Sequence, residues 1–211
     1  LMPLYKKINL TPTAQVLIWQ ITESFEDLFD EVILKDISLI RVNNMKALSH
    51  QKGFLSIRKL LQEIGYTDAD LFYDETGKPN LLDGKMISIT HSFEFSAIIV
   101  SDQIAGIDLE MQREKIITIA DKFMDTEFEF LPKEKNQDFI QKSTVIWGVK
   151  EAVFKIENQP GISFKDHISV FPFEMNEGKT NALLTFSSQI KEFTIQFEVV
   201  ENYIWVVAFE K

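Results

Sequence analysis

The second half of the chain carries the pattern that most restricts its fold. A helical pattern covers about 139–157, and the turn-forming run QPG at 159–161 interrupts it. Segments typical of strands follow, around 168–171, 182–187, 193–200 and 203–209. A long helix followed by consecutive strands in hairpins indicates an α+β protein with a largely antiparallel sheet.

The first half of the chain mixes the same two kinds of element. A strand is expected at 14–22, and Ser24 then has the features of an N-cap for a short helix. A long helix is expected at 45–64, ended by Gly65. Further on we expect a strand at 86–91, a hairpin that joins 97–100 to 104–110 through the turn SDQ, and a helix at 115–124.

Composition excludes several classes of protein. The 211 residues carry a net charge of −10, which argues against a protein that coats nucleic acid. No cysteine is present, so disulfides, thiolate nucleophiles and thiolate metal ligands are excluded. No apolar run is long enough to span a membrane, and the N-terminal residues lack the apolar core of a signal peptide. We therefore expect a cytoplasmic protein that acts without a membrane or nucleic acid.

The segment GIDLE at 106–110 places two acids close together. Side chains alternate along a strand, so Ile107 and Leu109 face one way while Asp108 and Glu110 share the other face. Two like charges on one face repel each other unless a cation or basic group lies between them. The alternative is a solvated strand face, which is common for an isolated D-x-E.

The segment WGVKEAVFK at 147–155 has charges among apolar residues. On a helix Trp147, Glu151 and Phe154 lie on one side, and Lys150 and Lys155 flank that side. Such a carboxylate is expected to be partly buried, and therefore paired or bound to a metal. The alternative is an ordinary i,i+4 pair of Glu151 and Lys155, which does not account for the two aromatic residues.

Asp108, Glu110 and Glu151 together offer only oxygen ligands, which suit Mg²⁺ or Mn²⁺ rather than zinc. Basic residues that can hold phosphate are also present, although neither a Walker loop nor a GxGxxG motif occurs. Taken singly, His91 is more often a structural or surface histidine, and Lys46 and Arg58 are more often surface charges. The candidate basic set is Lys46, Lys52, Arg58, Lys78, His91, Lys150 and Lys155.

Four segments in this order resemble the signature motifs of the 4′-phosphopantetheinyl transferases of the surfactin-synthetase type. They are GKP at 77–79, ITHS at 89–92, GIDLE at 106–110 and WGVKEAVFK at 147–155. The resemblance implies a pseudo-twofold α+β fold of two similar lobes, 1–103 and 104–211, each a small antiparallel sheet with a packed long helix. It further implies a single functional unit with the active site between the lobes, and we expect a monomer.

The resemblance also implies an activity and residue roles. The activity is Mg²⁺-dependent transfer of phosphopantetheine from coenzyme A to a serine of an acyl or peptidyl carrier protein, releasing adenosine 3′,5′-bisphosphate. The carrier would belong to fatty-acid, polyketide or nonribosomal peptide synthesis. Asp108, Glu110 and Glu151 would bind the metal, with Glu151 and Lys155 catalytic. Lys46, Lys52, Arg58, Lys78, Thr90, His91 and Lys150 would hold coenzyme A.

Some features depart from this family or leave alternatives. The family usually has Ser at Thr90, and Ser, Thr or Cys at Gly148, where a glycine costs a helix about 1 kcal/mol relative to alanine. A metal-dependent phosphodiester hydrolase and a catalytically silent coenzyme A or carrier binder remain alternative functions. Since carriers are also acidic, we expect apolar contacts to dominate docking, with Phe123, Met124 and Phe128 as candidates.

Overall fold

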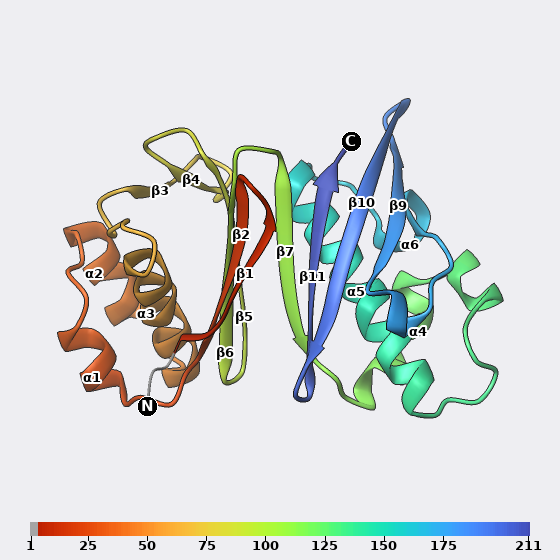
Figure 1. Ribbon diagram of the computed structural model, residues 1–211, viewed down its shortest axis with the longest axis horizontal. Helices are drawn as coiled ribbons and strands as arrows, with labels where there is room; N and C mark the ends of the chain where they lie inside the picture. The colour runs from red at the N-terminus through yellow and green to blue at the C-terminus, as the bar shows by residue number, and fades with distance from the viewer. Residues whose placement is uncertain (1–3) are drawn as a thin grey trace. The chain divides into compact units, whose positions relative to one another are not determined.

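The computed structural model describes residues 4–211, and the chain forms two compact units (Figure 1). The first unit ends at Gln103, and the second runs from Ile104 to Lys211. Both contain an antiparallel sheet with a long helix packed on it, so the α+β fold expected from the sequence is confirmed.

The sheet of the first unit has four antiparallel strands in the order β1-β2-β6-β5. They are β1 (Leu4–Thr11), β2 (Ala14–Gln20), β6 (Phe95–Ser101) and β5 (Met86–Ser92). β2 and β6 are the central pair and are rich in β-branched residues that are buried on both faces. This burial explains why the sequence of β6 is almost continuously apolar rather than alternating.

Three helices complete the first unit, together with a small β3–β4 ribbon (Leu71–Tyr73 and Pro79–Leu81). The helices are α1 (Phe25–Asp30), α2 (Asp36–Asn44) and α3 (Leu48–Gln62). Ser24 caps α1 as expected, because its hydroxyl oxygen accepts a bond from the Asp27 backbone N–H, and the Asp27 carboxylate accepts a bond from the Ser24 backbone N–H, which completes a capping box. α3 buries Leu55, Leu60 and Leu61 in one core with Leu17 and Ile98 of the sheet.

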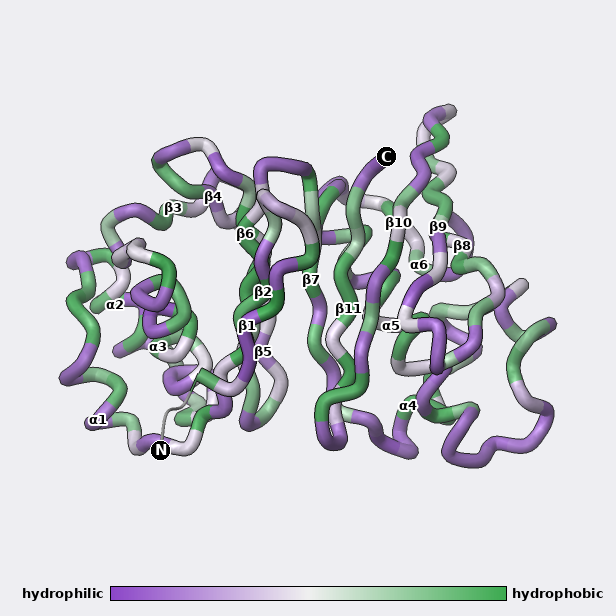
Figure 2. The backbone as a smooth tube through the Cα atoms, in the orientation of Figure 1, coloured by the Kyte–Doolittle hydropathy of each residue, from purple (hydrophilic) through white to green (hydrophobic). Residues whose placement is uncertain are grey.

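The sheet of the second unit has five antiparallel strands in the order β7-β11-β10-β9-β8. β10 alternates between hydrophobic and hydrophilic residues, whereas β11 is hydrophobic and buried from Tyr203 to Phe209 (Figure 2). The edge strand β7 pairs with β11 along its whole length. The strands are β7 (Ala105–Met111), β8 (Ile168–Val170), β9 (Lys179–Phe186), β10 (Gln189–Val200) and β11 (Tyr203–Glu210).

The long helix α5 (Gln137–Glu157) packs on β7 and β11. Its N-cap Asn136 accepts a bond from Phe139, and Asn158 ends it in the left-handed conformation. The expected apolar face is present, since Val149, Ala152 and Val153 are fully buried against the sheet. The shorter helical segments are α4 (Lys115–Phe123), η1 (Thr126–Glu129), α6 (Phe164–His167) and η2 (Met175–Glu177).

The hairpin expected between 97–100 and 104–110 is wrong. Both strands form, but β6 pairs with β2 and β5, while β7 pairs with β11 of the second unit. The true hairpin joins β5 to β6 through Phe93 and Glu94, and Phe93 has a positive φ of 50°. The sequence shows neither glycine nor asparagine at this turn, so the usual hairpin signal is missing.

Other elements extend or correct the sequence analysis. The sequence pattern predicts neither α2 nor β1. In α2, Ile37 and Ile40 are exposed, so the helix lacks a clean apolar stripe. α3 begins at Leu48 rather than near residue 45. None of the helices within residues 4–211 has the length and apolar character needed to cross a membrane.

Candidate functional site

Asp108 and Glu110 lie on the face of β7 that α5 covers. Asp108 is paired in register with Val206, and Glu110 with Ile204, and residues opposite one another in an antiparallel sheet share a face. Val206 and Ile204 belong to the core that α5 completes. The two acids therefore share one face, as the alternation predicted, and that face meets the helix rather than bulk solvent.

Two glycines bring α5 unusually close to this strand. A Cβ atom on Gly106 would lie 2.2 Å from the backbone oxygen of Ala152. A Cβ atom on Gly148 would lie 2.8 Å from Cγ2 of Val206 and 3.7 Å from Oδ2 of Asp108. Larger residues at these positions would push the helix away from β7 and β11, so Gly148 has a packing role that its helix propensity does not suggest.

Lys155 is bound to the first of these acids. Its Nζ lies 2.7 Å from Oδ1 of Asp108 and donates a second bond of 2.9 Å to the backbone oxygen of Ile107. Asp108 is almost fully buried, whereas the Lys155 side chain keeps 28% of its surface exposed. The lysine thus pairs across the helix–sheet boundary rather than with Glu151 one turn earlier, and it provides positive charge at the edge of the site.

Glu151 completes a set of interacting acids. Burial raises the pKa of Glu151 to about 7, Asp108 and Glu110 add to the rise, and Lys155 opposes it. Two neighbouring carboxylates can affect a third in this way only when all of them are close. Glu151 therefore exchanges a proton near neutral pH, which is the property expected of a general base or acid.

The donor set fits Mg²⁺ or Mn²⁺ in its chemistry. All candidate ligands are carboxylate oxygens, and the mutual repulsion that raises the pKa of Glu151 is what a divalent cation would relieve. Within residues 4–211, however, no group of three or more His, Asp or Glu side chains is arranged to hold a metal ion. The structure therefore presents interacting acids with Lys155 as counter-ion, and not a preformed metal site.

Lys150 is placed differently from the expectation that it faces phosphate. It is fully buried, and its Nζ lies 2.7 Å from Oε1 of Glu127, which is also buried. It donates further bonds to the backbone oxygens of Phe123 at 2.7 Å and Phe164 at 3.0 Å. Burial lowers the pKa of Lys150, and the Glu127 carboxylate opposes this shift. Its three protons are used inside the second unit, so we leave Lys150 out of the phosphate-binding set.

In the first unit, His91 lies at the end of β5 with its ring exposed. The ring packs over Gly53 of α3, where a Cβ atom would lie 2.6 Å from Cδ2 of the imidazole. The His50 ring meets it edge-on at 5.7 Å between centroids. Thr90 is buried beside His91 in the strand. The first turns of α3 and the end of β5 thus form one polar edge that contains a candidate anion ligand.

Three of the expected coenzyme A ligands are lysines of the first unit. Lys46 is exposed just before α3, Lys52 is half-buried on that helix, and Lys78 is half-buried in the loop before β4.

Arg58, also expected to hold coenzyme A, lies in the interior of the first unit. Its guanidinium is buried, forms a 2.9 Å ion pair with Asp68 and lies 3.5 Å from the centre of the Phe54 ring. Because these contacts occupy it inside the first unit, we also leave Arg58 out of the proposed site.

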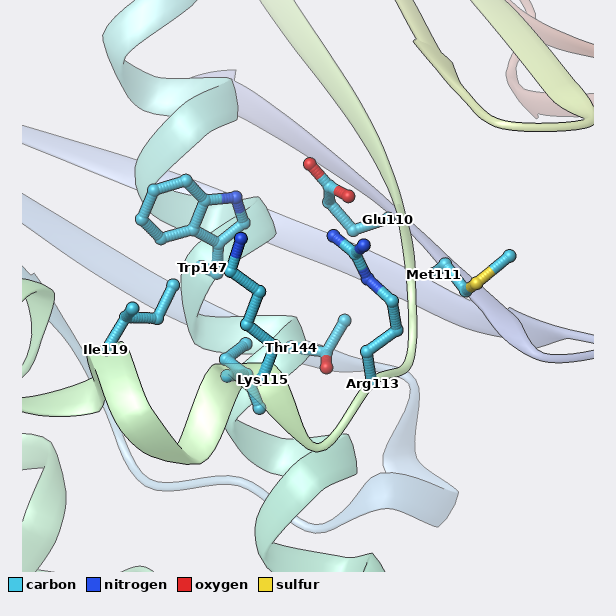
Figure 3. A pocket seen from close by; sticks show the side chains of 8 residues that line it. Glu110, Met111, Arg113, Lys115, Ile119, Thr144 and Trp147 are labelled. Atoms are coloured by element: carbon cyan, nitrogen blue, oxygen red, sulfur yellow. The ribbon is translucent and has the colours of Figure 1, made fainter.

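A pocket of about 140 Å³ lies beside Glu110 (Figure 3). The side chains of Glu110 and Arg113 point toward one another, and Lys115 reaches toward the indole of Trp147. The apolar part of its wall includes Ile116, Ile119 and Trp147. The pocket therefore joins one of the candidate metal ligands to an apolar wall that includes Trp147 and to two cationic side chains, Arg113 and Lys115, which belong to none of the sequence motifs.

The apolar docking residues expected from the sequence need correction. Phe123 and Met124 are buried in the core of the second unit, with exposed fractions of 1% and 0%, and so are not available to a partner. Phe128 remains available, since 37% of its surface is exposed. The sequence pattern of 123–128 does not distinguish the apolar residues that are buried, Phe123 and Met124, from the exposed Phe128.

No sequence pattern marks Glu127 or Asp68, the partners of the buried cations Lys150 and Arg58. Each lies in a polar stretch distant in sequence from its partner, where an acid is normally solvated. Asp68 also accepts bonds from the Lys35 backbone and the Ser38 hydroxyl, so it is held on several sides. Only the tertiary structure identifies these carboxylates as internal counter-ions.

The chain is therefore an α+β protein with interacting carboxylates on a strand and a helix, and Lys155 binds one of them, Asp108. No family model matches the chain. It is 26% identical over 175 residues to the 4′-phosphopantetheinyl transferase Gsp of Aneurinibacillus migulanus, an alignment that covers 80% of this chain and 72% of that protein. This distant similarity to a 4′-phosphopantetheinyl transferase agrees with the resemblance of the four motifs.

Proposed function

We propose that this protein transfers the 4′-phosphopantetheine arm of coenzyme A to a serine of an acyl or peptidyl carrier protein, releasing adenosine 3′,5′-bisphosphate. The observation that carries the proposal is the electrostatic coupling of Glu151 to Asp108 and Glu110, with Lys155 bound to Asp108. The distant similarity to Gsp supports the same activity. These acids occupy the positions that the resemblance assigns to metal binding.

The proposed chemistry uses residues of the second unit in separate roles. The carrier's serine oxygen attacks phosphorus of the coenzyme A pyrophosphate, and the P–O bond to adenosine 3′,5′-bisphosphate breaks. Glu151 is the proposed acceptor of the hydroxyl proton, since it is the acid of α5 that lies near Asp108 and Glu110. Lys155 stabilises the charge that develops on the leaving phosphate. The nucleophile belongs to the carrier, so the chain needs none of its own.

Asp108, Glu110 and Glu151 would hold the divalent cation, which, when bound, neutralises charge on the pyrophosphate. Lys46, Lys52, Lys78, Thr90 and His91 of the first unit remain candidates for holding coenzyme A, with His91 proposed at its 3′-phosphate. His91 suits this role because its exposed ring is supported on one side by Gly53 and on another by His50. A mobile histidine would lose more entropy on binding.

The proposed carrier contact lies on the segment that follows Glu110. It includes the pocket with Arg113, Lys115 and Trp147, and the exposed ring of Phe128. If apolar contacts dominate docking, raising the salt concentration has little effect on the Michaelis constant for the carrier. A steep rise of that constant with salt would instead assign docking to Arg113 and Lys115.

The test is incubation of the protein with coenzyme A, Mg²⁺ and an apo carrier, followed by mass spectrometry. A gain of one phosphopantetheine arm on the carrier, with release of adenosine 3′,5′-bisphosphate, supports the proposal. Hydrolysis of coenzyme A without a gain on the carrier would point to the phosphodiester hydrolase. Coenzyme A binding without turnover on fatty-acid, polyketide and peptide carriers would point to a silent binding protein.

A further inference from the structure

Lys150 and Glu127 lie at the centre of a network that joins five elements of the second unit. Lys150 of α5 bonds Glu127 of η1 and the backbone oxygens of Phe123 in α4 and Phe164 in α6. Glu127 accepts two backbone bonds of 3.0 Å, from Val170 of β8 and from Asp125. Every polar group of this buried pair is thus used, which is the condition for a buried ion pair to hold one arrangement.

The two carbonyls bonded by Lys150 belong to residues whose rings clamp Trp147. The Phe123 ring meets the indole nearly edge-on at 5.0 Å between centroids. The Phe164 ring lies 5.5 Å from it at a tilted angle. Lys150 therefore ties the backbone of both aromatic neighbours to the helix that carries Trp147. The indole in turn forms part of the pocket wall beside Glu110 (Figure 3).

We propose that Lys150 and Glu127 form a positioning pair that fixes Trp147 in the pocket wall beside Glu110, without Lys150 contacting the anionic substrate. The positioning of Trp147 does not depend on the proposed function; only the expected effect on the transfer rate rests on it. Lys150 is adjacent in sequence to Glu151, but its side chain is fully buried and directed to Glu127. A lysine that bound phosphate would have to give up three internal bonds and leave a buried carboxylate unpaired.

Tryptophan fluorescence tests the positioning without requiring any activity. Trp19 and Trp205 are only 2% and 3% exposed, whereas Trp147 is half-buried, so quenching by acrylamide mainly reports Trp147. We expect Glu127→Gln and Lys150→Met each to raise the quenching constant, because the aromatic clamp is released. Trp147→Phe should remove most of the quenchable emission. Arg58→Met, which breaks the buried pair of the first unit, is the matched control and should leave quenching unchanged.

Ligand binding and kinetics then separate positioning from substrate contact. Glu127→Gln and Lys150→Met should lower the transfer rate alike, by up to about a hundredfold for a displaced site wall. Both should keep the wild-type dissociation constant for coenzyme A, measured by calorimetry. Loss of coenzyme A affinity in Lys150→Met but not in Glu127→Gln would make Lys150 a direct ligand and overturn the proposal.

A double variant provides the same test in case the single variants Lys150→Met and Glu127→Gln fail to fold. Lys150→Met/Glu127→Leu removes both charges together, so no unpaired ion stays buried, while the carbonyls of Phe123 and Phe164 still lose their donor. Folded variants whose quenching equals that of the wild type would overturn the positioning role. If the wild-type protein neither binds coenzyme A nor modifies a carrier, the proposed function fails, yet the quenching measurements still decide the role of the pair.

Discussion

The two units share one architecture but fill the boundary between their long helix and sheet with different polar groups. In the first unit, the Ser56 hydroxyl of α3 donates to the Ser96 hydroxyl of β6 at 2.8 Å. In the second unit, the corresponding boundary holds Asp108 of β7, bound to Lys155 of α5 at 2.7 Å. One boundary is neutral and the other is charged.

The difference shows where chemistry can be located on such a scaffold. Paired hydroxyls satisfy each other and need nothing further, so the first boundary is stable by itself. Buried carboxylates demand a counter-ion; burial raises the pKa of Glu151, and its acidic neighbours Asp108 and Glu110 add to the rise. The second unit therefore concentrates negative charge that Lys155 offsets only in part, and in the proposed function a divalent cation would neutralise more of it.

The units are alike in another respect, because in each of them a buried cation of the long helix forms an ion pair with a fully buried acid. Arg58 of α3 pairs with Asp68, and Lys150 of α5 pairs with Glu127. In the pair of Lys155 and Asp108 only the acid is buried, and the lysine side chain is 28% exposed. Exposure thus distinguishes Lys155 from the two cations that are enclosed within their own units.

The largest expected effect is on catalysis. Glu151→Gln should lower carrier modification by about 10²–10⁴-fold, because the group proposed to accept the serine proton is lost. The melting temperature should not fall. Ser56→Ala is the matched control, since it breaks the polar contact across the boundary of the first unit and should leave turnover nearly unchanged. Near-normal turnover of Glu151→Gln with Mg²⁺ would refute the assignment of Glu151.

Breaking the buried pair of the first unit should give the largest loss of stability. Arg58→Met leaves Asp68 buried without its cation, which costs about 3–5 kcal/mol in the free energy of unfolding. Urea unfolding measures this change. Arg58→Met/Asp68→Leu should recover part of the loss. If Arg58→Met instead weakened coenzyme A binding at unchanged stability, Arg58 would return to the set of substrate ligands.

Gly148→Ala should destabilise the second unit although alanine favours helices. The new Cβ atom would lie 2.8 Å from Cγ2 of Val206, a β-branched side chain with little freedom to move. We expect a loss of about 1–3 kcal/mol in the free energy of unfolding. Gly148→Ala/Val206→Ala relieves the contact and is the control. A more stable Gly148→Ala protein would show that helix propensity outweighs the close approach.

The smallest expected effect is a change of stability with pH. Glu151 has a pKa of about 7 in the folded protein against an ordinary 4.5. Between these values the folded state keeps the proton that the unfolded state loses, so the free energy of unfolding falls as pH rises. Allowing for partial exposure, the contribution is on the order of 1–3 kcal/mol. Chemical unfolding with a chelator present measures it. Glu151→Gln should lack this part of the slope; an identical slope would contradict the raised pKa.

Much of the fold followed from local pattern. The capping box at Ser24 and the helices at 115–123 and 137–157 follow rules that depend on near neighbours in the chain. Strand pairing did not follow, because β6 is buried along its whole length and its apolar run fits more than one partner strand. The turn-like run SDQ between β6 and β7 favoured the mistaken hairpin, whereas β7 pairs with β11.

The sequence by itself determined the shared face of Asp108 and Glu110, because alternation along a strand is a local property. It also determined the apolar face of α5, through helical spacing. Only the tertiary structure decided that Lys155 meets Asp108 while Lys150 turns inward to Glu127. Both lysines flank the same helical side in sequence, and their different roles depend on segments distant in the chain that supply their counter-charges.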